Sequence, residues 1–204
     1  MSQSQFNGYR WASVAGAVTA GIGGVQSADA AAIVTSVDVD IPAGIADYHV
    51  DLNGDGTTEF DIQQYDTLVK AADIAGGTAL ALDGGNPTRA ANLPSGSLIG
   101  PGLTFGSPGA DQLTGISGGG PAGNFQVSDG AGYIGVRFQL AGDTHYGFVG
   151  YEGAGAENSA NGHVFALGYE TTPNTAIAAV PEPTSLVMLA AGAAGLSLYR
   201  RRAE

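Results

Sequence analysis

Apolar and polar residues alternate in several stretches between residues 37 and 170, and this two-residue period is typical of β-strands that bury one face. The first stretch places Val37, Val39 and Ile41 on one side and two aspartates on the other. Further strands are predicted at residues 48–52, 60–62, 79–83 and 98–105. An Asn-Gly-Asp-Gly sequence between the first two of these favours a reversal of the chain, so they are predicted to form a hairpin.

The second half of the chain predicts a longer hairpin. Residues 133–140 and 144–151 alternate in the same way and are joined by Ala-Gly-Asp, a three-residue connection that contains glycine. Residues 163–170 predict a final strand. Between the two halves, the glycine-rich stretch 111–132 predicts a surface loop, and residues 67–73 predict a short helix. Short strands separated by glycine turns indicate an all-β domain, either a β-sandwich or a jelly-roll-like arrangement.

Composition supports this fold class and restricts the possible partners. Glycine accounts for 34 of the 204 residues, which disfavours long helices because an interior glycine weakens a helix by about 1 kcal/mol relative to alanine. The net charge is -12, and the only cations away from the chain ends are Lys70, Arg89 and Arg137. Such a chain would repel nucleic acid, which is bound through clustered Lys and Arg. The absence of cysteine excludes disulfides and thiolate metal sites.

The N-terminal 30 residues have the order of a secretory signal. Arg10 precedes a mildly apolar stretch at residues 11–25, and Ala28-Asp29-Ala30 offers the small residues that signal peptidase requires. We therefore expect a signal peptide at residues 1–30, with Ala28 and Ala30 marking the cleavage site. The alternative is an N-terminal helix of the folded domain, which the glycines of the apolar stretch disfavour.

The C-terminal segment combines a proline motif, a short apolar stretch and a basic end. Pro181-Glu182-Pro183 keeps the backbone extended because each proline fixes its own φ and disfavours a helical residue before it. Residues 186–199 are apolar and close to the length of a membrane-spanning helix once flanking residues are added. This stretch predicts a short C-terminal transmembrane helix, with Arg200, Arg201 and Arg202 on the cytoplasmic side and the domain outside.

This order of motif, apolar helix and arginines resembles the PEP-CTERM sorting signal of Gram-negative bacteria. The resemblance implies that an exosortase recognises Pro181, Glu182 and Pro183, removes the helix, and delivers the protein to the cell surface or the exopolysaccharide matrix. Residues 133–149 also resemble part of uncharacterised PEP-CTERM secreted proteins, although these usually have Gly-Trp where this chain has Gly147-Phe148. The alternative is a plain membrane anchor. The expected organisation is a signal peptide (1–30), an acidic β domain (31–172), a linker (173–180) and a sorting tail (181–204).

The sharpest motif inside the domain lies at residues 51–61. Asp51, Asn53 and Asp55 alternate before Gly56, and this spacing suits a tight loop around a hard cation with oxygen ligands. The pattern resembles the calcium loops of EF-hand, dockerin and thrombospondin-repeat proteins, but Ile62 stands where the EF-hand has its bidentate glutamate. We expect a Ca²⁺ site with these ligands: Asp51, Asn53, Asp55, the carbonyl of Thr57, and Glu59 or Asp61. The alternative is a polar hairpin turn.

Other candidate chemistries are weaker. Residues 115–119 match the G-x-S-x-G nucleophile motif, but Gly120-Pro121 follows where that motif requires a helix. The three histidines, His49, His145 and His163, lack zinc-site spacing, although strands could bring the last two together. Aromatic residues gather in the last strands, where they would form the core, or where outward tyrosines would stack on sugars: Tyr133, Phe138, Tyr146, Phe148, Tyr151, Phe165 and Tyr169.

These observations predict a non-enzymatic exported protein that passes through an inner-membrane intermediate and is then held at the cell surface or in the extracellular matrix. Its processing partners would be signal peptidase and an exosortase-like enzyme, and its β domain would be stabilised by calcium. The rival hypotheses are a carbohydrate-binding module that acts on exopolysaccharide and a secreted hydrolase.

Overall fold

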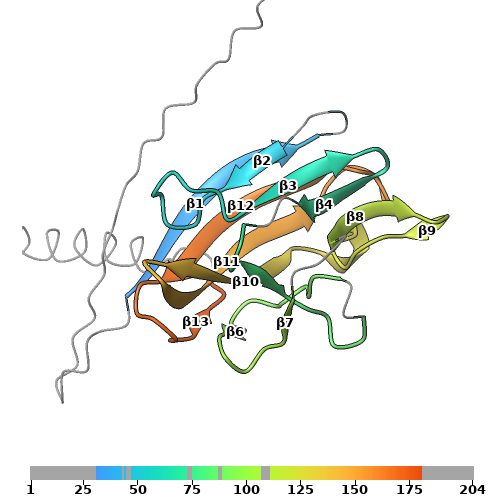
Figure 1. The fold of residues 1–204 in the computed structure, drawn as a ribbon. Coiled ribbons are helices and arrows are strands. Elements are labelled where there is room, and N and C mark those ends of the chain that lie inside the picture. Colours follow the sequence, from blue (N-terminus) through green and yellow to red (C-terminus); the bar gives the residue numbers. More distant parts are fainter. Residues whose placement is uncertain are drawn as a thin grey trace, which may run out of the picture.

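The computed structural model describes residues 31–42, 44, 47–72, 75–86, 89–106 and 111–180. These residues form an all-β domain in which two antiparallel sheets pack against a shared hydrophobic core (Figure 1). The predicted all-β class is therefore confirmed. The signal peptide, the C-terminal helix and all of their predicted site residues lie outside the described residues. Within the described part of the chain, no helix is long and apolar enough to cross a membrane.

The larger sheet has six strands in the order β1-β12-β11-β10-β5-β7. Its centre is the predicted hairpin of β10 and β11, in which Val136 faces Gly147. Strand β12 pairs with both β11 and the first strand of the domain. The bounds are β1 (Ala32–Ile41), β5 (Ala79–Ala81), β7 (Phe105–Gly106), β10 (Gly132–Leu140), β11 (Asp143–Gly153) and β12 (Gly162–Glu170).

The second sheet has five strands in the order β2-β3-β4-β8-β9. Strands β2 and β3 form the predicted early hairpin, in which Val50 faces Phe60 across the acidic loop. The bounds are β2 (Asp47–Val50), β3 (Phe60–Tyr65), β4 (Leu68–Ala72), β8 (Asp111–Ser117) and β9 (Gly120–Pro121). A short 3₁₀ helix, η1 (Val127–Asp129), follows this sheet and leads into the larger one.

The main core lies between the two sheets. Large fully buried side chains from both sheets contribute to it, including Phe60 and Ile62 from β3 and Phe138, Val149 and Tyr151 from the larger sheet. Their burial supplies the main driving force for folding, at roughly 25 cal/mol per Å² of apolar surface. A second cluster lies beside it and includes Tyr133, Phe148, Ile99 and Ile177.

The prediction of a short helix at residues 67–73 is wrong, because Leu68–Ala72 is strand β4. Its residues alternate between half-buried and buried positions, with Val69 and Ala71 turned into the core. Asp66 has a positive φ of 54° and closes the tight turn that connects β3 to β4. The helix-like spacing of apolar residues is therefore overridden by pairing with neighbouring strands on both sides.

The prediction of a surface loop throughout residues 111–132 is also wrong in its first part. Strand β8 pairs with β4 there, and Leu113 and Thr114 are buried. The register shifts between Val69 and Lys70, so the ladder contains an irregularity that obscures the alternation in the sequence. Gly118-Gly119 forms an exposed turn between β8 and β9, and residues 127–131 are also exposed, so the loop prediction holds for these parts of the stretch.

Residues 173–180, predicted to be a linker, include a strand of the domain. Strand β13 (Ile177–Ala178) pairs with β6 (Leu98–Ile99). Ile177 is only 2% exposed and Ala179 is fully buried. The amide of Ala179 donates to Ser97 O over 2.8 Å, and its carbonyl accepts a hydrogen bond from Gly96 N over 2.7 Å. Chain positions up to 179 are therefore attached to the domain.

Candidate functional site

The acidic loop connects β2 to β3 and is organised by its own carboxylates. Asp51 Oδ1 accepts a hydrogen bond from Gly54 N over 2.7 Å, and Asp51 Oδ2 accepts one from Gly56 N over 2.8 Å. Positive φ values at both glycines, 74° and 87°, allow the loop to curl around this carboxylate. Each carboxylate oxygen has two lone pairs, so one on each oxygen remains available to a cation.

Asn53 and Asp55 repeat the same arrangement further along the loop. Asn53 Oδ1 accepts from Asp55 N over 2.9 Å, and Asp55 Oδ1 accepts from Thr57 N over 2.7 Å. The hydrogen bond from the Thr57 backbone, with further ones from the side chains of Thr57 and Asn53, lowers the pKa of the exposed Asp55 carboxyl. The first half of the predicted ligand set therefore lies in one tight, charged loop.

Glu59 lies under the loop and points into the protein. Its side chain is buried, with the residue only 5% exposed, and Glu59 Oε2 accepts from Leu52 N over 2.7 Å. Burial raises the pKa of Glu59 to about 7; the hydrogen bond from Leu52 opposes this shift, and the negative charges of Asp51 and Asp55 add to it. Glu59 is therefore a buried carboxyl that titrates near neutral pH.

Asp61 is directed away from the loop, toward the neighbouring strand. Its Oδ1 lies 2.6 Å from Nδ1 of His49, which it faces in the β2–β3 ladder. This contact raises the pKa of His49 through the hydrogen bond and the opposite charge. Within the described residues, no group of three or more His, Cys, Asp or Glu side chains is arranged to hold a metal. A cation in the loop would thus rely on Asp51 and Asp55 together with Asn53, backbone carbonyls and water.

The other two histidines do not come together. His163 Nε2 lies 3.0 Å from Asp38 Oδ1, and its Nδ1 lies 3.2 Å from Glu152 Oε1. Burial lowers the pKa of His163, but these two hydrogen bonds outweigh burial, and the net shift is upward. His145 is buried and its Nδ1 contacts the carbonyl of Glu170. His163 on β12 faces Glu152 on β11, and His145 lies seven residues before Glu152 on β11. The two histidines are therefore about seven strand positions apart, or roughly 23 Å.

Ser117 and the aromatic residues give no assembled site. Ser117 is exposed beside the Gly118-Gly119 turn, and strand β9 follows it rather than a helix. Among the aromatic residues of the last strands, all but Phe165 are buried, and Phe165 is half-buried. Their assignment to the core is confirmed, so they do not offer an exposed ring to a sugar. Among the described tyrosines, Tyr65 on β3 is exposed, and Lys70 Nζ lies 4.6 Å from its ring centre.

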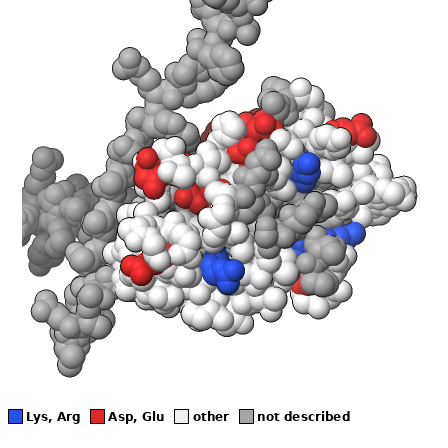
Figure 2. All heavy atoms as spheres, in the orientation of Figure 1, with Lys and Arg blue, Asp and Glu red and all other residues white. Residues whose placement is uncertain are grey.

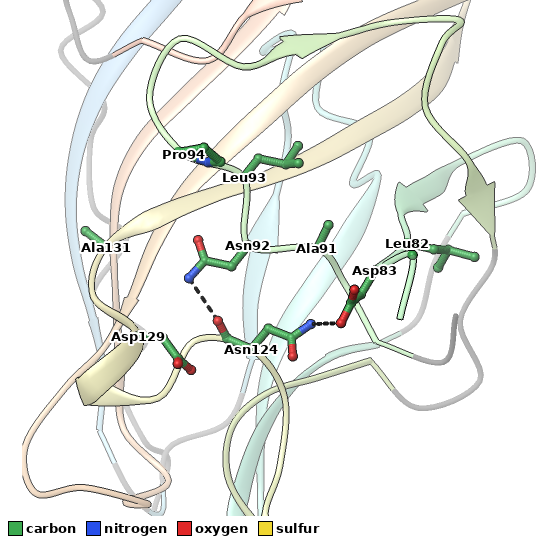
Figure 3. A pocket seen from close by; sticks show the side chains of 10 residues that line it. Leu82, Asp83, Ala91, Asn92, Leu93, Pro94, Asn124, Asp129 and Ala131 are labelled. Carbon is green, nitrogen blue, oxygen red and sulfur yellow. Dashed lines mark hydrogen bonds between the residues drawn. The ribbon is translucent and has the colours of Figure 1, made fainter. Parts of the chain in front are cut away.

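The loop after β5 and the loop before β10 form a cleft that the sequence pattern does not predict. Figure 3 shows Asp83, Asn92 and Asn124 on its polar side. Asn124 Nδ2 donates to Asp83 Oδ2 over 3.1 Å, and Asn92 Nδ2 donates to the carbonyl of Asn124 over 2.9 Å. Asn92 and Asn124 lie in stretches without strand periodicity, and Asp83 ends the stretch 79–83 that was predicted only as a strand, so no local signal in the sequence brings the three together.

The surface carries the acidic charge of the sequence. On the face drawn in Figure 2, acidic side chains form several patches and the cations are isolated spots. Arg89 directs its guanidinium to the carbonyls of Gly123 and Pro121 at 3.3 and 3.4 Å. Arg137 lies over the ring of Phe105 at 5.4 Å. The described cations therefore do not gather into the continuous basic surface that nucleic acid requires.

Fold and surface thus define an acidic all-β domain of two larger antiparallel sheets and a two-stranded one. Residues 179–202 match the family model of the PEP-CTERM protein-sorting motif, so the sorting signal predicted from the C-terminal sequence is confirmed. The motif implies processing by an exosortase and export through the membrane to the cell surface. No curated protein and no solved structure matches the chain. Because the match covers only the tail, it does not indicate the role of the β domain.

Proposed function

We propose that this chain is a non-enzymatic protein of the bacterial surface or extracellular polysaccharide matrix, released from its membrane tail near Pro181-Glu182-Pro183. The observation that carries the proposal is the position of the sorting motif. It begins at residue 179, where the last described strand of the domain has just ended. Processing there would free an intact acidic domain, because Ile177 and Ala179 are already packed against it.

Sorting is tested by the fate of the chain when the tail is changed. We expect a chain that ends at Val180 to be released into the medium, because it keeps its strands but lacks the motif and the apolar segment. A full-length Glu182→Ala variant should instead accumulate in the membrane fraction, because it keeps the apolar segment but loses the motif carboxylate. Mass spectrometry of each cell fraction measures both. Surface retention of the chain ending at Val180 would contradict the proposal.

The proposal that the chain is not an enzyme rests on the surroundings of the candidate catalytic residues among those that the structure describes. Ser117 lies on a hairpin turn rather than on a strand-to-helix elbow. His49 and His163 are engaged with carboxylates on the strands beside them, and His145 contacts a backbone carbonyl. Each of the three histidines thus has a partner that explains its position in the fold.

We propose in addition that Ca²⁺ binds the loop between β2 and β3 and stabilises the domain. The support is the convergence of Asp51, Asn53 and Asp55 in a loop whose backbone amides already orient them. Neutralising the carboxylates of Asp51 and Asp55 by a cation would also relieve their repulsion of Glu59 below. Asp61 contacts His49 and is omitted from this proposed ligand set.

Calcium is expected to raise the melting temperature of the purified full-length chain. With a dissociation constant of about 0.1 to 1 mM, which is usual for extracellular modules, about 10 mM Ca²⁺ adds roughly 1.4 to 2.7 kcal/mol. For a domain of this size, that corresponds to a shift of about 3 to 10 °C. Asp55→Asn should remove most of the shift, whereas Asp143→Asn, at the exposed start of β11, should leave it unchanged. Equal shifts in both variants would argue against binding at the loop.

A further inference from the structure

Among the described residues, the cleft between the loop after β5 and the loop before β10 is a hollow that the proposed function does not use. It has a volume of about 580 Å³ and opens to solvent. This volume lies within the range of about 300 to 1,000 Å³ that is usual for ligand sites. Its lining contains two aspartates, two asparagines and several small or apolar residues: Leu82, Asp83, Gly84, Ala91, Asn92, Leu93, Pro94, Asn124, Asp129 and Ala131.

The polar side of the cleft is held in place by a chain of hydrogen bonds. Asn124 Nδ2 donates to both Asp83 Oδ2 and the carbonyl of Ala90, and Asp83 Oδ1 accepts from Gly85 N over 2.9 Å. Asn92 is in turn bound to the carbonyl of Asn124. Side chains that are fixed before a ligand arrives lose little conformational entropy on binding, so this arrangement is suited to recognition.

The glycine at the start of β10, Gly132, leaves room for the side chain of Asn92. A Cβ atom added to Gly132 would overlap Oδ1 of Asn92, so the observed position of the Asn92 amide requires glycine at residue 132. The φ angle of Gly132 is not in the left-handed region, and space rather than backbone conformation explains the glycine. The glycine therefore serves the orientation of an amide that lines the cleft.

The opposite side of the cleft is apolar and comes from the stretch that bridges to β10. Leu93 pairs with Tyr133 through a pair of backbone hydrogen bonds of 3.0 and 2.9 Å, which fixes this wall to the larger sheet. Pro94 continues this wall, and Ala131 lies just before β10 begins (Figure 3). A ligand in the cleft would thus meet carboxylate and amide groups on one side and aliphatic carbon on the other.

The charge of the lining selects against anions. Asp83 and Asp129 are the charged lining residues, and the lining contains no Lys, Arg or His. Arg89, the cation close to Asp83 in sequence, uses its guanidinium on carbonyls of the neighbouring loop. Phosphate, sulfate and uronate groups would therefore be repelled, whereas neutral hydroxyl groups could donate to the carboxylates and exchange hydrogen bonds with the amides.

We propose that this cleft binds a neutral saccharide, with Asp83, Asn92, Asn124 and Asp129 as hydrogen-bonding partners of its hydroxyl groups. A sugar ring has a polar rim and an apolar face of C–H groups, and the two sides of the cleft match these two surfaces. Ionised carboxylates accept hydrogen bonds that are about twice as strong as neutral ones, which compensates for the loss of water from the hydroxyls. This site is independent of the acidic loop and of the sorting motif.

The test uses the full-length chain in a detergent without a sugar headgroup, applied to an array of neutral and anionic glycans. We expect retention on neutral glycans, and the best of them is then titrated by calorimetry. Asn92→Ala and Gly132→Ala should each raise its dissociation constant about fivefold to tenfold. Asn92→Ala removes the amide of Asn92, whereas Gly132→Ala keeps this amide but displaces it from its position. Tyr65→Ala, which removes the exposed ring on β3, is the matched control and should change the constant less than about twofold.

A further variant covers the case in which a cleft substitution prevents folding. Asp129 is exposed, and Asp129→Asn can still accept the hydrogen bond from Gln126 N, so this variant should fold and weaken the saccharide by a similar factor. Failure to bind any neutral glycan, or a preference for uronate polymers, would overturn the proposal. Binding that survives all three cleft variants or is abolished by Tyr65→Ala would also overturn it, because the saccharide would then lie elsewhere.

Discussion

Raising the pH from about 5 to about 8 in metal-free buffer is expected to lower the free energy of unfolding by about 2 to 3 kcal/mol through Glu59 alone. Glu59 is buried below the acidic loop, and its pKa is raised from 4.5 to about 7. The folded state therefore binds this proton more tightly than the unfolded chain does. The stabilisation is fully present below about pH 4.5 and is lost as the pH rises through 7.

The variant Glu59→Gln isolates this contribution. Glutamine keeps an oxygen that can accept from Leu52 N but has no charge to bury, so the unfolding free energy should become less dependent on pH and higher at pH 8. His49 and His163 also have raised pKa values, and they leave a smaller residual decrease of the same sign as the pH rises through theirs. Glu157→Gln, the same change at an exposed position, is the control.

Denaturant titrations of the full-length chain at each pH measure these free energies. An unchanged pH dependence in Glu59→Gln would show that the carboxyl is already ionised in the folded state. Stability that increases between pH 5 and pH 8 in the unmodified chain would contradict the direction of the shift itself. The experiment requires a chelator, because calcium in the loop above would favour the ionised form of Glu59.

Gly115→Ala is expected to destabilise the domain by at least about 3 kcal/mol. Gly115 has a φ of 115°, which alanine rarely adopts, and a Cβ there would overlap the carbonyl of Thr67 and lie 2.6 Å from Cα of Leu68. Both contacts are backbone atoms, one in the turn before β4 and one at the start of β4, so the clash cannot be relieved by a change of rotamer. The buried amide of Gln126, which hydrogen-bonds to the Gly115 carbonyl over 3.1 Å, would be displaced as well.

Gly118→Ala provides a matched control three residues further on. Gly118 also has a positive φ, 60°, but nothing lies within 4 Å of an added Cβ. It should cost only about 1 to 2 kcal/mol, the price of the left-handed conformation. Thermal or chemical unfolding compares the two variants directly. Similar losses in both would mean that backbone conformation alone matters at Gly115 and that β8 does not approach β4 as closely as described.

Strands that bury one face could be predicted from the sequence, whereas strands shaped by close contacts could not. Val37, Val39 and Ile41 alternate with polar residues because only one face of β1 meets the core. In β8, by contrast, Gly115 replaces an apolar side chain because the backbone of β4 occupies that space. A glycine required by close packing cannot be distinguished in the sequence from a glycine required by a turn. The predicted surface loop at residues 111–132 failed for this reason.

The same distinction applies to the candidate site. Asp51, Asn53 and Asp55 bind amides only two to five residues away, so their arrangement follows from local spacing. Glu59 and Asp61 are both buried and point where the sheet directs them, the first to Leu52 N and the second to His49 on the neighbouring strand. The cleft depends on Asn92 and Asn124, which are 32 residues apart. Contacts of this kind are set by strand topology and leave no periodic signal.

Strand β13 holds the folded domain close to the sorting motif. The chain is tied to the domain through Ala179, and the Pro-Glu-Pro sequence of the sorting motif begins at Pro181. Three residues reach at most about 11 Å even when fully extended, so the surface around β6 and β13 must lie almost against the enzyme during cleavage. The shape of the folded domain, and in particular exposed Leu98 on β6, therefore becomes part of what the enzyme has to accommodate. The retained domain would end in a strand rather than in a loose tether.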